Sequence, residues 1–307
     1  MKKKEFRDVH GILLLDKPQG LSSNQAMQRA RHLFRAKKAG HTGSLDPLAT
    51  GLLPICFGEA TKIAGYLLGS SKAYAAECRL GITTTTDDSE GEVVDTRVVP
   101  ALDADAIEAA LKNLRGRITQ IPPIYSALKQ GGVALYKRAR RGEEVAAPPR
   151  EVEVFRLDLL AHEGEVLKLY VECGSGTYVR SLVRDLGAAL GCGAHLTALR
   201  RLWVDPFRLP AMSTIEQLEI LAQSQPDALD ALLLPLDHGL ASLPKLSLSE
   251  DEALRLSQGK PLSRPDQSEM PLCRALAPSG HLVALVEIEA DGCVCVKRGF
   301  NAISPRS

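Results

Sequence analysis

Aromatic residues and long hydrophobic runs are scarce in this sequence. Only 4% of the 307 residues are Phe, Trp or Tyr, so Leu, Val, Ile and Ala must build the core. The apolar run at 11–15, which follows the N-terminal lysines, is too short for a signal peptide or a membrane span. With 45% apolar and 24% charged residues, the composition excludes a disordered chain, and the length suits about two domains.

Paired cysteines are missing as well. The seven cysteines are odd in number and scattered without a CxxC spacing, so the sequence indicates neither a disulfide framework nor a zinc site. We therefore expect reduced, mostly buried thiols and a cytoplasmic protein. The P-loop, GxGxxG, HExxH, GxSxG and EF-hand patterns are absent too, which removes the commonest nucleotide-binding, metal and serine-hydrolase functions.

Net charge is small, but its distribution is uneven. The formal net charge is +1, yet residues 1–40 hold ten Lys and Arg against three Asp and Glu, and residues 111–150 hold nine against two. Acid collects elsewhere, with eight carboxylates against one Arg at 83–110 and eight against three basic residues at 211–260. This pattern fits one basic face that binds RNA or DNA, and it fits solvated helix faces equally well.

The periodicity of apolar residues predicts strands alternating with helices. Strands are expected where short apolar or alternating runs are bounded by turn residues, at 11–15, 72–80, 152–160, 166–173, 195–204, 272–276, 282–288 and 293–298. Helices are expected where the spacing is three to four, from a Ser22 or Ser23 cap to 34, at 59–68, 102–114, 177–190, between 214 and 234, and at 249–257. Pro244 is a reasonable domain boundary before a small β-rich segment.

Two stretches lack such periodicity. Residues 83–95 are polar and turn-forming, and we expect a solvated surface loop there in preference to a cation site at Asp87 and Asp88. Residues 118–150 hold three Pro or Gly pairs around a basic patch, and a long excursion of this kind is usually functional or disordered.

The loop Gly40–Gly51 is the strongest candidate for chemistry. Its glycines permit unusual backbone shapes, and Pro47 stiffens the position after Asp46, so that this carboxylate is held in place. Taken alone, the loop favours an aspartate that caps a turn.

Five ordered blocks change that interpretation. They are Leu15–Pro18, Gly40–Gly51, Tyr125–Lys129, Gly176–Arg180 and Leu199–Arg201, and together they span most of residues 11–203. The chain thereby resembles the TruB family of bacterial tRNA pseudouridine-55 synthases. The resemblance implies an α/β fold of the α+β type, with a mixed, largely antiparallel sheet flanked by helices at 1–244 and a small β-rich PUA-like domain at 245–307.

The resemblance also implies an isomerase that converts one uridine in the T loop of tRNA to pseudouridine, without cofactor or metal. Asp46 matches the family's catalytic aspartate, and Arg180 matches the arginine that would hold it ionised. Tyr74 matches the tyrosine that stacks on the flipped base. Further matches are the substrate-pocket positions Tyr178 and Leu199, His41, which occupies the space vacated by the base, and the supporting Lys17.

The basic excursion matches the family's thumb loop, which closes on the T loop. Its phosphate-binding residues would be Lys129, Lys137, Arg138, Arg140 and Arg141, with Tyr136 packed beside them. The resemblance implies a monomer whose partner is the T stem-loop of tRNA, with no membrane and no metal. Two other functions remain open at this point: a non-catalytic RNA-binding or RNA-folding protein, whose activity could also accompany catalysis, and an Asp46-dependent hydrolase. The sequence does not distinguish attack at C6, attack at C1′ and a glycal intermediate.

Overall fold

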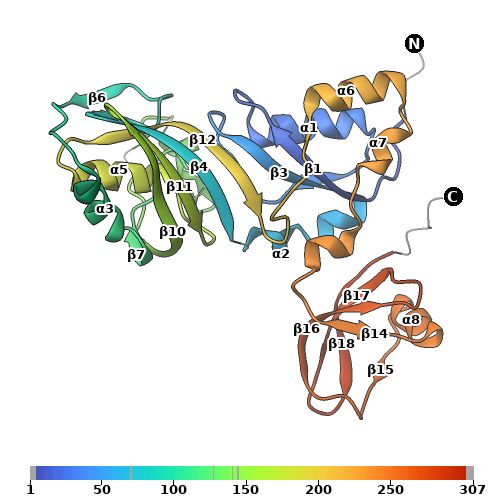
Figure 1. Cartoon of the computed structure of the whole chain (residues 1–307). Helices are drawn as coiled ribbons and strands as arrows, with labels where there is room; N and C mark the ends of the chain where they lie inside the picture. The colour runs from blue at the N-terminus through green and yellow to red at the C-terminus, as the bar shows by residue number, and fades with distance from the viewer. Residues whose placement is uncertain (1–4, 70, 127, 140, 144, 302–307) are drawn as a thin grey trace.

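A large mixed sheet forms the wider part of the molecule (Figure 1). The computed structural model describes residues 5–69, 71–126, 128–139, 141–143 and 145–301. The strands follow the order β13-β1-β3-β12-β4-β11-β10-β7, and β2 pairs with β3. Their bounds are β1 Gly11–Lys17, β2 Ala39–His41, β3 Thr50–Phe57, β4 Lys72–Leu80, β7 Gly116–Gln120, β10 Arg150–Glu163, β11 Val166–Cys173, β12 Ala194–Val204 and β13 Ser213–Thr214.

Helices cover this sheet where its strands present apolar side chains. The helices of this part are α1 Ser23–Leu33, α2 Ala64–Leu68, α3 Ala104–Lys112, α5 Val179–Ala189, α6 Ile215–Ser224 and α7 Ala228–Ala231, with the 3-10 turns η1 Gly58–Lys62 and η2 Leu236–Leu240. Strand β11 alternates buried and half-buried residues because only one of its faces packs against α3 and α5. Strand β1 is buried along nearly its whole length because side chains pack on both of its faces.

The centre of the sheet requires a glycine. Strands β3 and β12 run parallel there, with Gly51 opposite Arg201. Gly51 has a φ of +95°, and a Cβ at this position would lie 2.2 Å from the carbonyl oxygen of Arg201. The end of the Gly40–Gly51 loop is therefore pressed directly against β12.

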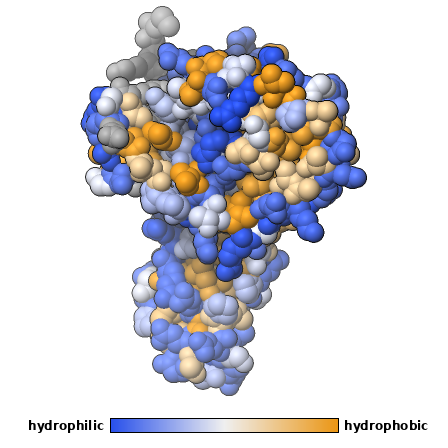
Figure 2. Space-filling model, turned by 90° about the vertical axis from the view of Figure 1, so that its left-hand side faces the viewer, coloured by the Kyte–Doolittle hydropathy of each residue, from blue (hydrophilic) through white to orange (hydrophobic). Residues whose placement is uncertain are grey.

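A smaller five-stranded sheet follows, ordered β14-β16-β17-β18-β15 (Figure 1). Its elements are β14 Lys245–Ser247, α8 Glu250–Ser257, β15 Leu262–Ser263, β16 Met270–Leu276, β17 Leu282–Ile288 and β18 Cys293–Gly299. Figure 2 shows this narrower part below the wider one, with hydrophobic side chains scattered among hydrophilic ones on the face in view. The predicted α/β fold with a largely antiparallel sheet and a small β-rich C-terminal part is confirmed, whereas the boundary at residue 244 stays a prediction.

Most of the expected elements form within a few residues of their predicted ends. The single helix expected at 59–68 is wrong in detail, because η1 and the short α2 divide that segment. The basic excursion contains the hairpin β8 Lys129–Gln130 and β9 Val133–Ala134 and one short helix, α4 Leu135–Ala139. All seven cysteines are free and five are buried, as expected.

The segment at 83–95 was expected to be a solvated loop, and this holds for most of its residues but is wrong for Asp88. It is bracketed by the paired strands β5 Ile82–Thr84 and β6 Val93–Thr96, and the Asp88 side chain between them is only 3% exposed. Thr86 donates a hydrogen bond to Asp88 at 2.5 Å, so the turn folds around this carboxylate. The reason for the burial lies outside the segment, in helix α5.

Candidate active site

The loop that carries Asp46 is fixed on both sides of the aspartate. The buried Ser23 hydroxyl accepts a hydrogen bond from the Leu45 amide at 2.7 Å and donates one to the Leu45 carbonyl at 3.0 Å. On the other side, the Gly20 amide donates to the Pro47 carbonyl at 2.8 Å. A turn from Asp46 to Ala49 closes with a backbone hydrogen bond of 3.0 Å. Asp46 therefore projects from a rigid turn that is anchored at the start of helix α1.

Arg180 joins Asp46 to Asp88. Its Nη2 lies 3.0 Å from Asp46 Oδ2, and its Nη1 lies 3.3 Å from Asp88 Oδ2. The carbonyls of Thr86 and Tyr125 accept further hydrogen bonds from the same guanidinium, at 3.0 and 2.8 Å. The Arg180 side chain is 4% exposed, whereas that of Asp46 is 42% exposed. The cation is thus buried and fixed, while the carboxylate faces an opening to solvent.

Asp88 is a site residue that was not predicted from the sequence. Its partner, Arg180, lies 92 residues away, and no spacing rule connects a polar turn with a helix so distant. Asp87, beside it, pairs with Arg184 at 3.0 Å. Arg180 and Arg184, four residues apart on α5, are therefore each neutralised by an aspartate of this turn.

The charge state of Asp46 reflects opposing effects. Burial raises the pKa of Asp46 above its ordinary value, while Arg180 lowers it, Asp88 raises it and Lys17 lowers it. The expected Arg180 contact is present, but it does not hold the pKa of Asp46 at or below the ordinary value. Lys17 is fully buried and donates to the carbonyls of Pro18 at 2.9 Å and Leu21 at 2.6 Å. Burial lowers the pKa of Lys17 to about 8.

Tyr74 and Arg201 face each other across neighbouring strands. They are register partners on β4 and β12. Burial raises the pKa of Tyr74, and the charge of Arg201 opposes that shift. Arg201 is only 1% exposed, and it donates to the Leu52 carbonyl at 2.7 Å and to the Gly43 carbonyl at 3.3 Å. Arg201 was not predicted as a site residue, although its position in the Leu199–Arg201 block was the available signal.

Three of the remaining predicted residues lie around this centre. Tyr178 immediately precedes α5, and its backbone is held by the buried Gln120 side chain through hydrogen bonds of 2.8 and 3.1 Å. Leu199 is buried and lines a groove of about 430 Å³ that also contains Leu48. His41 is half-buried on β2, where burial lowers its pKa.

The thumb residues are only partly described. Arg138 pairs with Glu143 at 2.6 Å, Arg141 lies 3.8 Å from the same carboxylate, and Lys137 is exposed. Arg140 and the side chains of Lys129 and Tyr136 lie outside the described part of the chain. At its start, the excursion is fastened to α5, because Ser181 and Arg184 donate to the Ile121 carbonyl.

Buried polar atoms without hydrogen-bond partners concentrate in this region. Among the described residues they are His41 Nδ1, Thr42 Oγ1, Ser126 Oγ, Arg150 Nε and Nη2, and Arg180 Nε. All belong to the Asp46 loop, to the two ends of the thumb excursion or to α5. Because a buried unpaired donor or acceptor costs about 1–3 kcal/mol, such a concentration is typical of a place where a polar ligand binds.

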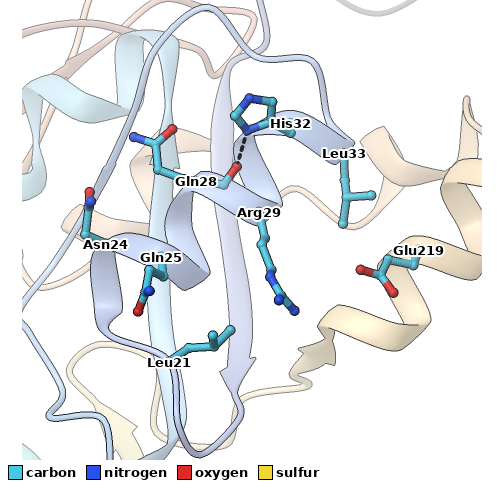
Figure 3. A pocket seen from close by; sticks show the side chains of 8 residues that line it. All are labelled: Leu21, Asn24, Gln25, Gln28, Arg29, His32, Leu33 and Glu219. Atoms are coloured by element: carbon cyan, nitrogen blue, oxygen red, sulfur yellow. Dashed lines mark hydrogen bonds between the residues drawn. The ribbon is translucent and has the colours of Figure 1, made fainter.

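Other features of the surface are separate from this centre. A groove of about 520 Å³ lies between α1 and α6. Figure 3 shows the side chains that line it, which are those of Leu21, Asn24, Gln25, Gln28, Arg29, His32, Leu33 and Glu219. No predicted site residue lines it.

Within the described ranges, no cluster of three or more His, Cys, Asp or Glu side chains could hold a metal ion. No helix there is long and apolar enough to span a bilayer.

Three family models match successive parts of the chain. The TruB family pseudouridylate synthase N-terminal domain matches residues 31–179, the tRNA pseudouridylate synthase B C-terminal domain matches 180–241, and the tRNA pseudouridine synthase II C-terminal domain matches 243–296.

Relatives match nearly the whole chain. The tRNA pseudouridine synthase B of Xanthomonas campestris pv. campestris (strain 8004) is 55% identical over 97% of this chain and 96% of its own length. The protein of the same name from Xylella fastidiosa (strain Temecula1 / ATCC 700964) is 55% identical over 98% of this chain and 99% of its own length.

Solved structures with low identity share the fold. A chain from an H/ACA RNP bound to a substrate RNA containing 2'-deoxyuridine has a TM-score of 0.74 at 23% identity, over 95% of this chain and 86% of that one. A chain from a Cbf5-Nop10-Gar1 complex has a TM-score of 0.73 at 24% identity, over 94% of this chain and 84% of that one. With the sequence matches spanning both sheets and with Asp46 held against Arg180, the chain belongs to the TruB family of pseudouridine synthases.

Proposed function

We propose that the chain isomerises uridine 55 in the T loop of tRNA to pseudouridine. The observation that carries the proposal is the Asp46 carboxylate, 3.0 Å from a buried guanidinium and still 42% exposed to solvent. The curated relatives are named tRNA pseudouridine synthase B, which supports tRNA as the substrate.

The reaction needs a fixed carboxylate and involves no oxidation or reduction. The N1–C1′ bond of uridine breaks, a C5–C1′ bond forms, the C5 hydrogen leaves as a proton and N1 gains a proton. The product is an isomer of the substrate with the same oxidation state, so a positioned carboxylate can act as nucleophile or as electrostatic partner. Asp46 supplies this group, and Arg180 orients it through a contact that Asp88 and two backbone carbonyls hold in place.

Access to the carboxylate requires an everted base. A uridine within a folded loop must leave its stack before its C1′ can approach Asp46. Tyr74 then stacks on the base, Tyr178 and Leu199 complete the pocket wall, and His41 occupies the space that the base vacates in the RNA. Lys17 supports the Asp46 turn, because it donates to the carbonyl of Pro47 at 3.4 Å as well as to those of Pro18 and Leu21.

The thumb completes the interface with the T stem-loop. The proposed phosphate contacts of the thumb are Lys129, Lys137, Arg138, Arg140 and Arg141. When the thumb closes, Arg138 and Arg141 would leave the Glu143 carboxylate and bind RNA phosphates. We also propose a cytoplasmic monomer, with residues 1–244 as the catalytic domain and 245–307 as a PUA-like domain. The seven free thiols fit a reducing compartment.

The test is release of tritium from tRNA that is labelled at uridine C5. Wild-type protein is expected to release the label from position 55, and Asp46→Asn is expected to abolish release while it retains tRNA binding. Asp95→Asn, which removes a carboxylate from an exposed pair with Arg97, is the matched control and should retain full activity. Release by Asp46→Asn at the wild-type rate would contradict the proposed role of Asp46.

A further inference from the structure

We propose that Arg150 binds a phosphate of the RNA at the edge of the active-site cleft. The inference rests on the proposed RNA substrate. Arg150 is the first residue of β10, directly after the thumb excursion, and lies opposite Gln120 of β7. Gln120 in turn holds the backbone of Tyr178. Arg150 is thus built into the framework that positions Tyr178.

The guanidinium of Arg150 has a fixed place. Its Cζ lies 4.8 Å from the centre of the Tyr178 ring, which gives a cation–π contact. Gly176 lies beside it with a φ of +89°, and a Cβ there would approach the guanidinium to 3.5 Å. The aromatic ring and the glycine therefore confine the group without taking up any of its N–H donors.

Two of those donors are buried without a partner. Nε and Nη2 of Arg150 have no hydrogen-bond partner among the described residues. No carboxylate of the described residues lies within ion-pair distance of Arg150, in contrast to Arg156 on the same strand. Arg156 lies over Tyr170 at 4.9 Å, a similar distance, but it is bonded to Asp158. Arg150 is therefore a confined cation whose Nε and Nη2 lack an acceptor.

A phosphate satisfies this arrangement better than a base or a ribose does. A guanidinium presents a planar fork of N–H donors that matches two oxygens of a phosphate, and an anion also neutralises the half-buried charge. Tyr178 precedes Arg180 by two residues, and Arg180 touches Asp46 at 3.0 Å. The ligand is therefore a backbone phosphate close to the everted nucleotide, separate from the thumb cations that contact the stem.

The first test measures how salt affects RNA binding. Full-length protein carrying Asp46→Asn, which prevents turnover, is titrated with a T stem-loop RNA at several salt concentrations, with and without Arg150→Ala. Loss of one phosphate contact should weaken binding about tenfold and reduce the slope of log Kd against log salt by about 1. Arg156→Ala is the matched control, and it should change neither quantity. An unchanged slope in Arg150→Ala would overturn the inference.

The second test identifies the phosphate and does not depend on Arg150→Ala folding well. Each phosphate of the stem-loop near the target uridine is replaced in turn by a neutral methylphosphonate. At one of these positions, the replacement should weaken RNA binding by the wild-type protein. At the same position, the replacement should weaken binding by Arg150→Ala and by Arg150→Lys less or not at all. If both variants lose affinity at the same positions and to the same extent as wild type, Arg150 does not contact a phosphate.

Activity separates this inference from the proposed function. If wild-type protein releases no tritium, the isomerase proposal fails, while the salt and methylphosphonate results still decide whether Arg150 binds RNA. If wild type releases tritium but Arg150→Ala binds RNA with the wild-type slope, only the inference fails.

Discussion

At the scale of single residues, the site combines a buried cation with a carboxylate whose ionisation is opposed by burial. Arg180 and Lys17 favour the ionised form of Asp46, and burial together with Asp88 disfavours it. A carboxylate held in this way is fixed beside a cation and still open to a substrate, which suits a nucleophile or an electrostatic partner. The same opposition sets the acidic limit of the activity.

The first prediction concerns that pH dependence. As pH rises, kcat/KM for tritium release should rise with an apparent pKa above 3.8, because burial raises the pKa of Asp46 and the reaction requires its ionised form. Above pH of about 8 the rate should fall, because the neutral Lys17 amine keeps only two N–H donors for the three carbonyls, of Pro18, Leu21 and Pro47, that the ammonium binds beside the Asp46 turn.

Lys17→Met is the variant that tests this explanation. It should remove the alkaline limb and move the acidic limb to higher pH, since a cation that lowers the pKa of Asp46 is gone. Lys62→Met removes an i,i+3 ion pair with Glu59 and serves as the control with an unchanged profile. An alkaline limb that persists in Lys17→Met would assign that limb to another group.

Asp88 supplies the second prediction at this scale. Asp88→Asn removes the second carboxylate of Arg180 and leaves a polar side chain of similar size. We expect kcat to fall on the order of 10²-fold with little change in RNA affinity, because the guanidinium that orients Asp46 loses one of its anchors. Asp87→Asn, which affects Arg184 instead, should have a much smaller effect on kcat. Equal losses in the two variants would show that Asp88 has no special connection with catalysis.

At the scale of elements, helix α1 has two separate tasks at its first turn. Ser22 caps the helix in a capping box with Gln25. The next residue, Ser23, holds both backbone polar groups of Leu45, the residue before Asp46. One hydroxyl therefore stabilises the helix, and its neighbour positions the catalytic loop.

This division predicts different effects for two adjacent substitutions. Ser22→Ala should cost about 1 kcal/mol of stability by denaturant titration and leave kcat unchanged. Ser23→Ala should cost about 1–3 kcal/mol, because two buried groups of Leu45 lose their partner, and it should also lower kcat. If kcat falls equally in both variants, the loop depends on helix stability and not on the Ser23 contacts.

Helix α1 also shows which features of the fold could be predicted from the sequence. The cap at Ser22 and the spacing of Ala26 and Ala30 are local signals, and α1 forms where they predicted it. Strands β4 and β11 likewise follow from their own periodicity. The Ser23–Leu45 contact and the Asp88–Arg180 pair join segments that are distant in sequence, so no local pattern could reveal them.

The site residues likewise divide into those that a motif predicted and those that only contacts between distant segments reveal. Asp46 and Arg180 were predicted as a pair through the family resemblance, and their distance agrees with that prediction. Asp88 was wrongly placed in a solvated loop because its neighbours in sequence are polar, while its burial is imposed by helix α5. Arg150 has no motif of its own, and its unpaired donors become visible only when the strands and the Tyr178 ring are in place.

At the scale of the whole molecule, one apolar cluster joins the two sheets. Leu285 and Phe300 from the C-terminal part pack in the same cluster as Ile63, Leu236 and Leu240 from the wider part. Polar contacts reinforce this junction, since the Asn301 amide donates to Glu59 at 2.7 Å and Arg274 donates to the Leu243 carbonyl at 3.1 Å.

A continuous core of this kind predicts that the two parts unfold together. Wild-type protein should give a single calorimetric transition, because exposing the cluster on one side also exposes it on the other. Phe300→Ala removes a large buried side chain from the junction and should cost about 3–5 kcal/mol. We expect the weakened junction to divide the transition, with the C-terminal part unfolding first and the wider part near its original temperature.

The exposed Leu254→Ala, on helix α8 and away from the junction, is the control and should leave a single transition. Tritium release measured between the two transitions of Phe300→Ala would then report whether the wider part is catalytic without a folded C-terminal part. Two transitions in the wild-type protein would show that the shared cluster does not couple the parts, and the C-terminal sheet would have to be treated as an independent unit.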